Sequence, residues 1–339
     1  MGPVKIAIVG IDRYADLVLD CLTRSDRLSL CAICDNRPAV LNPLRNTYEH
    51  IEFYDDPREM ILRSKPNIVL LWRDRFGDEF LNSVVEENIW LIIRPPIMGG
   101  LSTAVRMIKQ SDKKNTGVYV WTPWLYLPCY QSVPDWLTDQ QIRSFSCRSY
   151  NNLSQMELPA EDTLLSAGMY PFIFLSQRWL GLPEQVYCRQ LQRSTLNGSA
   201  ESMFQYFGLA NLIYPHSLGV VTVGINAGPI EEEILVAGNL NQIRLDPAQA
   251  HLFDCSGRHI ESSHHYEPEE ARRIAYTRIF EQLWQSFIEK RRSNDIELKR
   301  HLGVLAILEA AALSSRTGHP EQLVKIVELN NIPELTQNL

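Results

Sequence analysis

In the first third of the chain, short apolar segments alternate with segments whose apolar residues recur at helical spacing. A short continuous apolar run predicts a buried strand, and apolar residues three and four positions apart predict a helix. The predicted strands are 4–10, 28–35, 66–72, 89–95 and 117–123, and the predicted helices are 15–25, 56–64, 78–88 and 102–114. This alternation predicts an α/β fold with a parallel, doubly wound Rossmann sheet.

After about residue 123 the alternation stops. A predicted helix at 164–181 is followed by strand-like segments, and the chain closes with two predicted helices. The strand-like segments are 219–226, 231–239, 242–246 and 250–255, and the closing helices are 268–292 and 296–318. Strands that follow one another without helices are typical of an antiparallel sheet. We therefore predict two domains, a Rossmann domain at 1–122 and an α+β domain with an open, mainly antiparallel sheet at 123–339.

Composition limits the partners of the chain. The 339 residues are 45% hydrophobic and 22% charged, which is ordinary for a globular protein, and the net charge of −7 gives no basis for binding nucleic acid or an anionic membrane. Apolar stretches are too short to cross a bilayer. The first strand begins at residue 4, leaving no room for a signal peptide, and the seven cysteines show no regular spacing. We therefore expect a cytoplasmic protein with reduced thiols.

The turn after the first predicted strand has the length of a dinucleotide-binding fingerprint. It consists of Gly10, Ile11, Asp12, Arg13, Tyr14 and Ala15. The fingerprint G-x-G-x-x-G/A uses its second glycine to let the backbone approach the pyrophosphate, and here Asp12 stands at that position with a side chain and a negative charge. Two interpretations stay open: a nucleotide fold that no longer holds its nucleotide, and a turn that still binds with Asp12 pointing outward.

The end of the second predicted strand carries a candidate ribose ligand. Asp35 stands at the usual distance from Gly10 for the carboxylate that binds the adenosine ribose, and Asn36 and Arg37 follow it. The pairing of Gly10 with Asp35 favours NAD, while Arg37 keeps NADP open. The alternative is a plain strand-end turn, where Asp-Asn is common.

Six segments, in this order, resemble the glucose–fructose oxidoreductase/inositol dehydrogenase family, called Gfo/Idh/MocA. They are KIAIVGIDRYA, AICDNRP and YDDPREMI in the first part and LLSAGMYPFIFLSQRWLG, ILVAGNLNQIRLD and ILEAAALSSRTG in the second. The resemblance implies a Rossmann domain and an α/β domain whose open sheet mediates dimers or tetramers. It also implies hydride transfer between a nicotinamide and a sugar or cyclitol hydroxyl, with the active site between the domains.

The chain departs from this family at the turns after its third and fourth strands. The family's Glu-Lys-Pro turn corresponds to Arg94-Pro95-Pro96, so Pro95 replaces the lysine. Arg94 stays protonated and can stabilise an alkoxide, but it cannot shuttle a proton, and pairing with a surface carboxylate is its alternative role. The family's Thr-Pro turn falls on Trp72-Arg73, large side chains that either fill nicotinamide space or belong to the core.

The family's second-domain helix carries Asp and His four residues apart, and the corresponding residues here are Ser166 and Tyr170. A tyrosine at the His position resembles glucose–fructose oxidoreductase and dimeric dihydrodiol dehydrogenase, which makes Tyr170 a candidate acid/base. A phenol with a pKa of about 10 needs a neighbouring cation to act near neutral pH, and Arg94 is the candidate. The alternative is a core tyrosine.

Changes at Asp12, Trp72-Arg73, Pro95 and Ser166 together favour a catalytically degenerate member that still binds NAD, NADP or a sugar-like ligand. The second hypothesis is an active NAD(P)-dependent oxidoreductase that uses Tyr170 with Arg94. A third is non-redox chemistry, such as elimination or hydrolysis with bound NAD. The residues expected at the cofactor are Gly10, Ile11, Asp12, Arg13, Tyr14, Asp35, Asn36, Arg37, Trp72, Arg73 and Pro95.

No metal site is predicted. Cys31 and Cys34 fall on one strand and point to opposite faces. The segment at 250–265 holds several histidines, but its DCSGR sequence is typical of a hairpin turn, so we interpret them as dispersed on strands.

Overall fold

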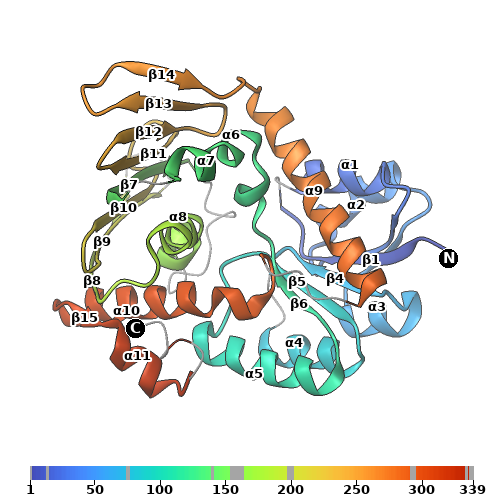
Figure 1. The fold of residues 1–339 in the computed structure, drawn as a ribbon. Helices are drawn as coiled ribbons and strands as arrows, with labels where there is room; N and C mark the ends of the chain where they lie inside the picture. Colours follow the sequence, from blue (N-terminus) through green and yellow to red (C-terminus); the bar gives the residue numbers. More distant parts are fainter. Residues whose placement is uncertain are drawn as a thin grey trace. The chain divides into compact units, whose positions relative to one another are not determined.

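The computed structural model describes residues 2–12, 15–73, 77–138, 141–152, 164–196, 202–290, 295–332 and 335. The chain forms two compact units, each described here by itself (Figure 1). The first comprises Met1–Pro123 and Arg273–His301, and the second comprises Trp124–Arg272 and Leu302–Leu339.

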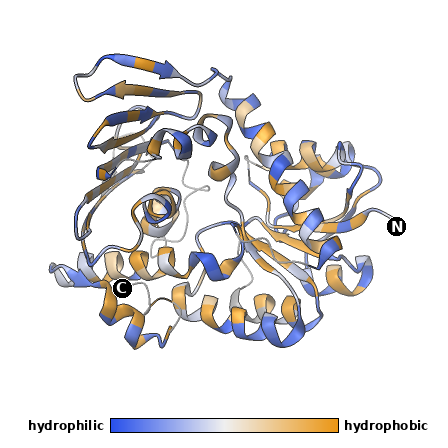
Figure 2. Cartoon of the chain, in the orientation of Figure 1, coloured by the Kyte–Doolittle hydropathy of each residue, from blue (hydrophilic) through white to orange (hydrophobic). Residues whose placement is uncertain are grey.

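A six-stranded sheet forms the centre of the first unit, and all its described strand pairs are parallel. The sheet order is β3-β2-β1-β4-β5-β6, with β1 at Val4–Val9, β2 at Leu28–Cys34, β3 at Glu52–Tyr54, β4 at Ile68–Leu71, β5 at Trp90–Ile93 and β6 at Val118–Val120. Figure 2 shows these strands mostly as hydrophobic, as expected for strands covered on both faces. The predicted Rossmann sheet is confirmed.

Five helices of the first unit connect these strands: α1 at Ala15–Thr23, α2 at Pro38–Thr47, α3 at Pro57–Ser64, α4 at Gly77–Glu86 and α5 at Gly100–Lys114. Helix α2 and strand β3 were not predicted from the sequence. Helix α2 contains Pro43 and buries only Leu41, so it has little of the apolar periodicity that marks a helix, and β3 has only three residues.

The segment Arg273–His301 packs with the first unit, whereas the predicted boundary placed everything after residue 122 in a second domain. Aromatic contacts hold it there. In α9, at Pro268–Glu289, Tyr276 and Phe280 lie with ring centroids 5.1 and 5.3 Å from that of Trp121. Further along, the Val120 amide donates to the Ile296 carbonyl at 2.7 Å. The domain boundary predicted from the alternation of strands and helices could not include this segment in the first unit, because its packing depends on contacts between side chains that are far apart in the sequence.

The second unit is built on a nine-stranded sheet of order β14-β13-β12-β11-β7-β10-β9-β8-β15. Its described pairs are antiparallel except for β10 with β7, so the predicted mainly antiparallel sheet is confirmed. The strands are β7 at Ile142–Asn151, β8 at Gln185–Leu196, β9 at Ser202–Ile213, β10 at Leu218–Ile225, β11 at Glu231–Gly238, β12 at Asn241–Leu245, β13 at Ala250–Asp254, β14 at His259–Ser262 and β15 at Glu321–Gln322.

Two helices pack against this sheet, α8 at Leu164–Leu180 and α10 at Leu302–Thr317 (Figure 1). A Cβ placed on Gly168 would lie 3.2 Å from Val223, so α8 lies close to β10. The Cys188 amide donates to Ser314 Oγ at 2.9 Å, which joins β8 to α10. Shorter helical segments complete the unit: η1 at Pro123–Tyr126, which begins at the last residue of the first unit, α6 at Pro128–Gln131, α7 at Val133–Leu137 and α11 at Leu323–Leu329.

Among the described residues, the helices are all too short or too polar to span a membrane.

The short helix η4, at Leu298–His301, ends in a fully buried histidine. Burial lowers the pKa of His301 from 6.5 to about 3, so the folded protein keeps this imidazole neutral at pH values where the unfolded chain binds a proton. Its stabilising contribution is therefore complete above pH 6.5 and falls as the pH drops from there towards 3.

We expect this linkage to lower the free energy of unfolding by about 2 kcal/mol between pH 7 and pH 5. Urea unfolding at both pH values would measure it. His301→Gln should lose that part of the pH dependence, while His50→Gln, at an exposed position, should keep it. An equal pH dependence in all three proteins would contradict the assignment.

Candidate functional site

The predicted cofactor residues of the first unit lie at one edge of its sheet. Strands β1, β2, β4 and β5 are parallel, and each is followed by a predicted site residue: Gly10, Asp35, Trp72 and Arg94, respectively. The carboxyl ends of parallel strands meet at the same edge, and in open α/β sheets this edge holds the ligands.

Gly10 allows the first turn to approach the turn after β4. Its φ is +78°, and a Cβ there would lie 2.3 Å from the carbonyl oxygen of Arg73. Its amide donates to the Cys34 carbonyl at 2.8 Å. Glycine is therefore required at this position both by backbone conformation and by space.

The carboxylate of Asp35, only 1% exposed, is surrounded by donors of its own chain. Oδ1 accepts from the Arg37 amide at 2.9 Å and from Arg37 Nε at 2.8 Å. Oδ2 accepts from the Ile11 amide at 2.9 Å and from Arg37 Nη2 at 2.7 Å. Arg37 Nη2 also donates to the Ile11 carbonyl at 2.5 Å, so the arginine connects the two turns.

Burial alone would raise the pKa of Asp35, but the Arg37 guanidinium and the amides of Ile11 and Arg37 outweigh it and lower that pKa. Hydrogen bonding to Asp35 raises the pKa of Arg37 in turn. Each carboxylate oxygen accepts two hydrogen bonds, which fills its lone-pair positions. A ribose hydroxyl at this predicted position would have to displace an internal donor. Asn36, which lies between Asp35 and Arg37 in the sequence, is exposed.

Asp12 lies at the centre of a second network. Its Oδ1 accepts from Trp72 Nε1 at 2.7 Å, and its Oδ2 accepts from Arg94 Nη1 at 2.5 Å. The Arg94 guanidinium carbon lies 4.4 Å from the centroid of the Trp72 ring, a cation–π contact. Three strands that are neighbours in the sheet, β1, β4 and β5, thus each contribute one member. The carboxylate that pairs with Arg94 is therefore Asp12, which does not point outward.

Trp72 is a core residue. It is 3% exposed, and its ring meets Trp121 edge-on at a centroid distance of 5.6 Å. Arg73, which follows Trp72 in the sequence, and Pro95, which follows Arg94, are half-buried. The predicted cofactor residues Arg13 and Tyr14 lie outside the described residues.

Tyr170 belongs to helix α8 of the second unit, whereas Arg94 belongs to the first. The Tyr170 side chain is fully buried, and this burial raises its pKa well above that of an exposed phenol. It therefore stays protonated near neutral pH. Ser166, one helical turn earlier, is half-buried.

Two histidines of the outer hairpin come together, although we predicted a dispersed set. His251 Nδ1 on β13 lies 2.8 Å from Ser262 Oγ, and His259 Nε2 on β14 lies 2.7 Å from the same oxygen. The predicted DCSGR turn joins β13 to β14, and Gly257 adopts a left-handed backbone conformation in it, with φ at +84°. Within the described part of the chain, no three His, Cys, Asp or Glu residues are arranged to hold a metal ion.

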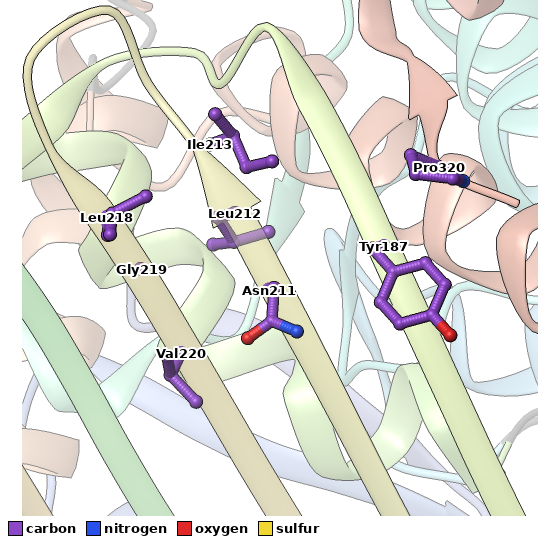
Figure 3. A pocket seen from close by; sticks show the side chains of 8 residues that line it. All are labelled: Tyr187, Asn211, Leu212, Ile213, Leu218, Gly219, Val220 and Pro320. Carbon is purple, nitrogen blue, oxygen red and sulfur yellow. The ribbon is translucent and has the colours of Figure 1, made fainter.

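A hollow of about 450 Å³ lies over strands β8 to β10 of the second unit (Figure 3). It is lined by Tyr187, Asn211, Leu212, Ile213, Leu218, Gly219, Val220 and Pro320. These side chains include no carboxylate, imidazole or cation. The hollow therefore offers an apolar contact surface rather than a reactive centre. It was not predicted, because two of the strands that line it, β8 and β9, were not predicted from the sequence.

Comparison with known proteins shows the same architecture. An oxidoreductase from Agrobacterium radiobacter, solved in complex with NAD+, L-tartaric acid and magnesium, has a TM-score of 0.78 at 14% identity, covering 95% of this chain and 99% of that one. The WlbA dehydrogenase from Bordetella pertussis, in complex with NADH and UDP-GlcNAcA, has a TM-score of 0.74 at 15% identity, covering 94% and 98%. The chain has the fold of these oxidoreductases.

In sequence, the chain is 33% identical over 101 residues to D-glucoside 3-dehydrogenase from Escherichia coli K12. The match covers 29% of this chain and only 28% of that relative. No family model matches. The predicted resemblance to Gfo/Idh/MocA oxidoreductases is thus confirmed at the level of fold.

The Asp35–Arg37 pair generates a stability prediction. Asp35→Asn replaces one acceptor oxygen by an NH₂ group that faces buried donors, so we expect the free energy of unfolding to fall by about 2 to 4 kcal/mol. Urea unfolding at pH 7 would measure it. Asp26→Asn, the same change at an exposed position of the same unit, should stay within about 0.5 kcal/mol of the parent. Equal stability of the two variants would show that the pair contributes nothing measurable.

Proposed function

We propose that this protein is a catalytically degenerate member of the Gfo/Idh/MocA-type oxidoreductases, in which internal contacts have replaced the cofactor contacts of the Rossmann unit. The Asp12–Arg94 ion pair, with Trp72 as second donor to Asp12, is the observation that carries this proposal. Asp12 stands where the fingerprint needs a residue without a side chain, and its charge is of the same sign as a diphosphate.

The residues that would hold NAD or NADP do not fit it in this arrangement. Gly10 keeps the tight turn, but Asp12 opposes the diphosphate and Asp35 already accepts four hydrogen bonds. The similarity of fold to NAD-bound proteins supports some remaining affinity for NAD or NADP. The contacts of Asp12 and Asp35 indicate that this affinity is low. We therefore propose binding only at high cofactor concentration, after both networks open.

The alternative, an active enzyme using Tyr170 with Arg94, receives less support. Tyr170 is fully buried with a raised pKa, and Arg94 is paired with a carboxylate that partly neutralises the charge a phenolate would need. Pro95 supplies no ionisable group in place of the family lysine. These facts favour a binding or regulatory role over proton transfer.

A sugar-like molecule is the ligand class we propose. The sequence relative is a D-glucoside 3-dehydrogenase by name, and one structural neighbour was solved with UDP-GlcNAcA. We also propose a cytoplasmic location, which the seven free cysteines support.

For assembly, we propose a homo-dimer or homo-tetramer formed through the nine-stranded sheet. Helices α8 and α10 pack against this sheet, and apolar side chains also reach solvent from it: Leu218 is 60% exposed and Leu191 is 71% exposed. Together with the hollow over β8 to β10, they make an apolar surface that a second copy would cover.

Cofactor binding is the first measurement. Purified protein is titrated with NADH and with NADPH, and binding is measured by calorimetry and by fluorescence. We expect no binding at micromolar cofactor concentrations. A polyol and sugar screen with NAD+ and NADP+ should give no turnover above that of Tyr170→Phe. Micromolar binding together with turnover that Tyr170→Phe abolishes would overturn the proposed function and establish the active enzyme.

The assembly proposal predicts a particle mass of two or four times 38.9 kDa by light scattering. Leu218→Glu places a charge in the proposed interface and should weaken association at least tenfold, because burying an unpaired charge is costly. Leu62→Glu, at a residue 70% exposed on the first unit, is the matched control and should leave the mass unchanged. A monomeric parent protein at tens of micromolar would rule this interface out.

A further inference from the structure

Two donors from neighbouring strand ends converge on one carboxylate at the edge of the six-stranded sheet. Trp72 Nε1, after β4, and Arg94 Nη1, after β5, reach the two oxygens of Asp12 at 2.7 and 2.5 Å. One donor per oxygen is the arrangement by which proteins bind carboxylates and phosphates from outside. Here the bound anion is tethered, because Asp12 belongs to the turn after β1.

The donors are positioned by contacts that do not involve Asp12. The Trp72 amide donates to the Val9 carbonyl at 2.9 Å, and the indole packs on Trp121. The Arg94 amide donates to the Leu71 carbonyl at 2.9 Å, and its guanidinium stacks on the Trp72 ring. We therefore expect both donors to keep their places when the Asp12 side chain is shortened.

Arg94 and Asp12 form a partly buried ion pair. The Arg94 side chain is 29% exposed and that of Asp12 is 14% exposed, so water screens the pair only in part. Shortening Asp12 leaves a half-buried guanidinium beside an indole N–H, at the space that a carboxylate had filled. A small oxyanion restores both the charge balance and the two hydrogen bonds.

We infer that Trp72 and Arg94 form an oxyanion receptor that Asp12 occupies as an internal ligand. The inference rests on the proposed function in one respect: it explains the loss of the cofactor's diphosphate by competition from a tethered carboxylate. Because the fold holds the Asp12 carboxylate in place, its effective concentration lies far above that of any free ligand, so a free oxyanion competes poorly with it in the parent protein. The receptor takes carboxylates and phosphates by the same chemistry.

The test is chemical rescue of Asp12→Ala. Thermal unfolding is followed at pH 7 in sodium formate from 0 to about 100 mM, with sodium chloride keeping the ionic strength constant, so that general screening does not change. We expect the unfolding temperature of Asp12→Ala to lie below that of the parent in chloride and to rise with formate along a saturating curve with a midpoint in the millimolar range. The parent should not respond.

Three controls locate the effect. Asp26→Ala removes the same charge at an exposed position and should show no formate response. The double variant Asp12→Ala with Arg94→Ala should lose the rescue. Pyrophosphate in place of formate separates the sources of the oxyanion: a lower midpoint than for formate identifies a receptor for diphosphate, and a higher one identifies a receptor for carboxylates.

A formate response of Asp12→Ala no larger than that of the parent or of Asp26→Ala would overturn the receptor. Should Asp12→Ala not fold, Asp12→Ser provides the same test with a side chain that can still hydrogen-bond within the turn. The outcome is distinct from that of the proposed function: hydride transfer by the parent protein would overturn the proposed function, whereas absent rescue would overturn only the receptor.

Discussion

The need to neutralise charge at the carboxyl edge of the parallel sheet governs the first unit. Asp12 and Asp35 both follow strands whose side chains are mostly buried, where an unpaired carboxylate would be costly. Each is compensated by an arginine and by at least one further N–H donor: Arg37 with the Ile11 amide, and Arg94 with the Trp72 indole. Both arginines thus donate to carboxylates of their own chain, at the edge of the sheet where open α/β folds hold their ligands.

Several departures from the Gfo/Idh/MocA pattern lie at this edge of the sheet and depend on one another. Taken along the sequence, Asp12, Trp72 and the turn containing Arg94 and Pro95 are separate losses. In the structure, Asp12, Trp72 and Arg94 form one network, so each accounts for the others. A carboxylate in the first turn requires a cation nearby, and the arginine beside Pro95 supplies it. The tryptophan both donates to the carboxylate and stacks on the cation.

The sequence predicted the fold where its physical signal was strong. Strands β4 and β5 are continuous apolar runs and β1 is one apart from Lys5, as expected for strands buried on both faces, and all three were predicted within a few residues. Strands β8 and β9 were missed because polar side chains are interspersed among their apolar ones, as in QVYCRQLQ, and no short run stands out. The candidate site residues were predicted from the dinucleotide fingerprint and from the family resemblance, but their pairings were not. Asp12 is 60 residues from Trp72 and 82 from Arg94, and spacing does not reveal such contacts.

In both units, the predicted site residues are engaged in contacts within the chain, by different physical means. In the first, polar groups at the predicted cofactor positions hydrogen-bond to one another, so that their donors and acceptors are satisfied within the chain. In the second, the tyrosine that resemblance proposed as acid/base lies in the helix–sheet core, where burial holds its proton. Catalytic sites are typically less stable than they could be, because their groups are kept available for substrate. Here both sets of groups contribute to the fold instead, through hydrogen bonds within the chain in the first unit and through burial in the second.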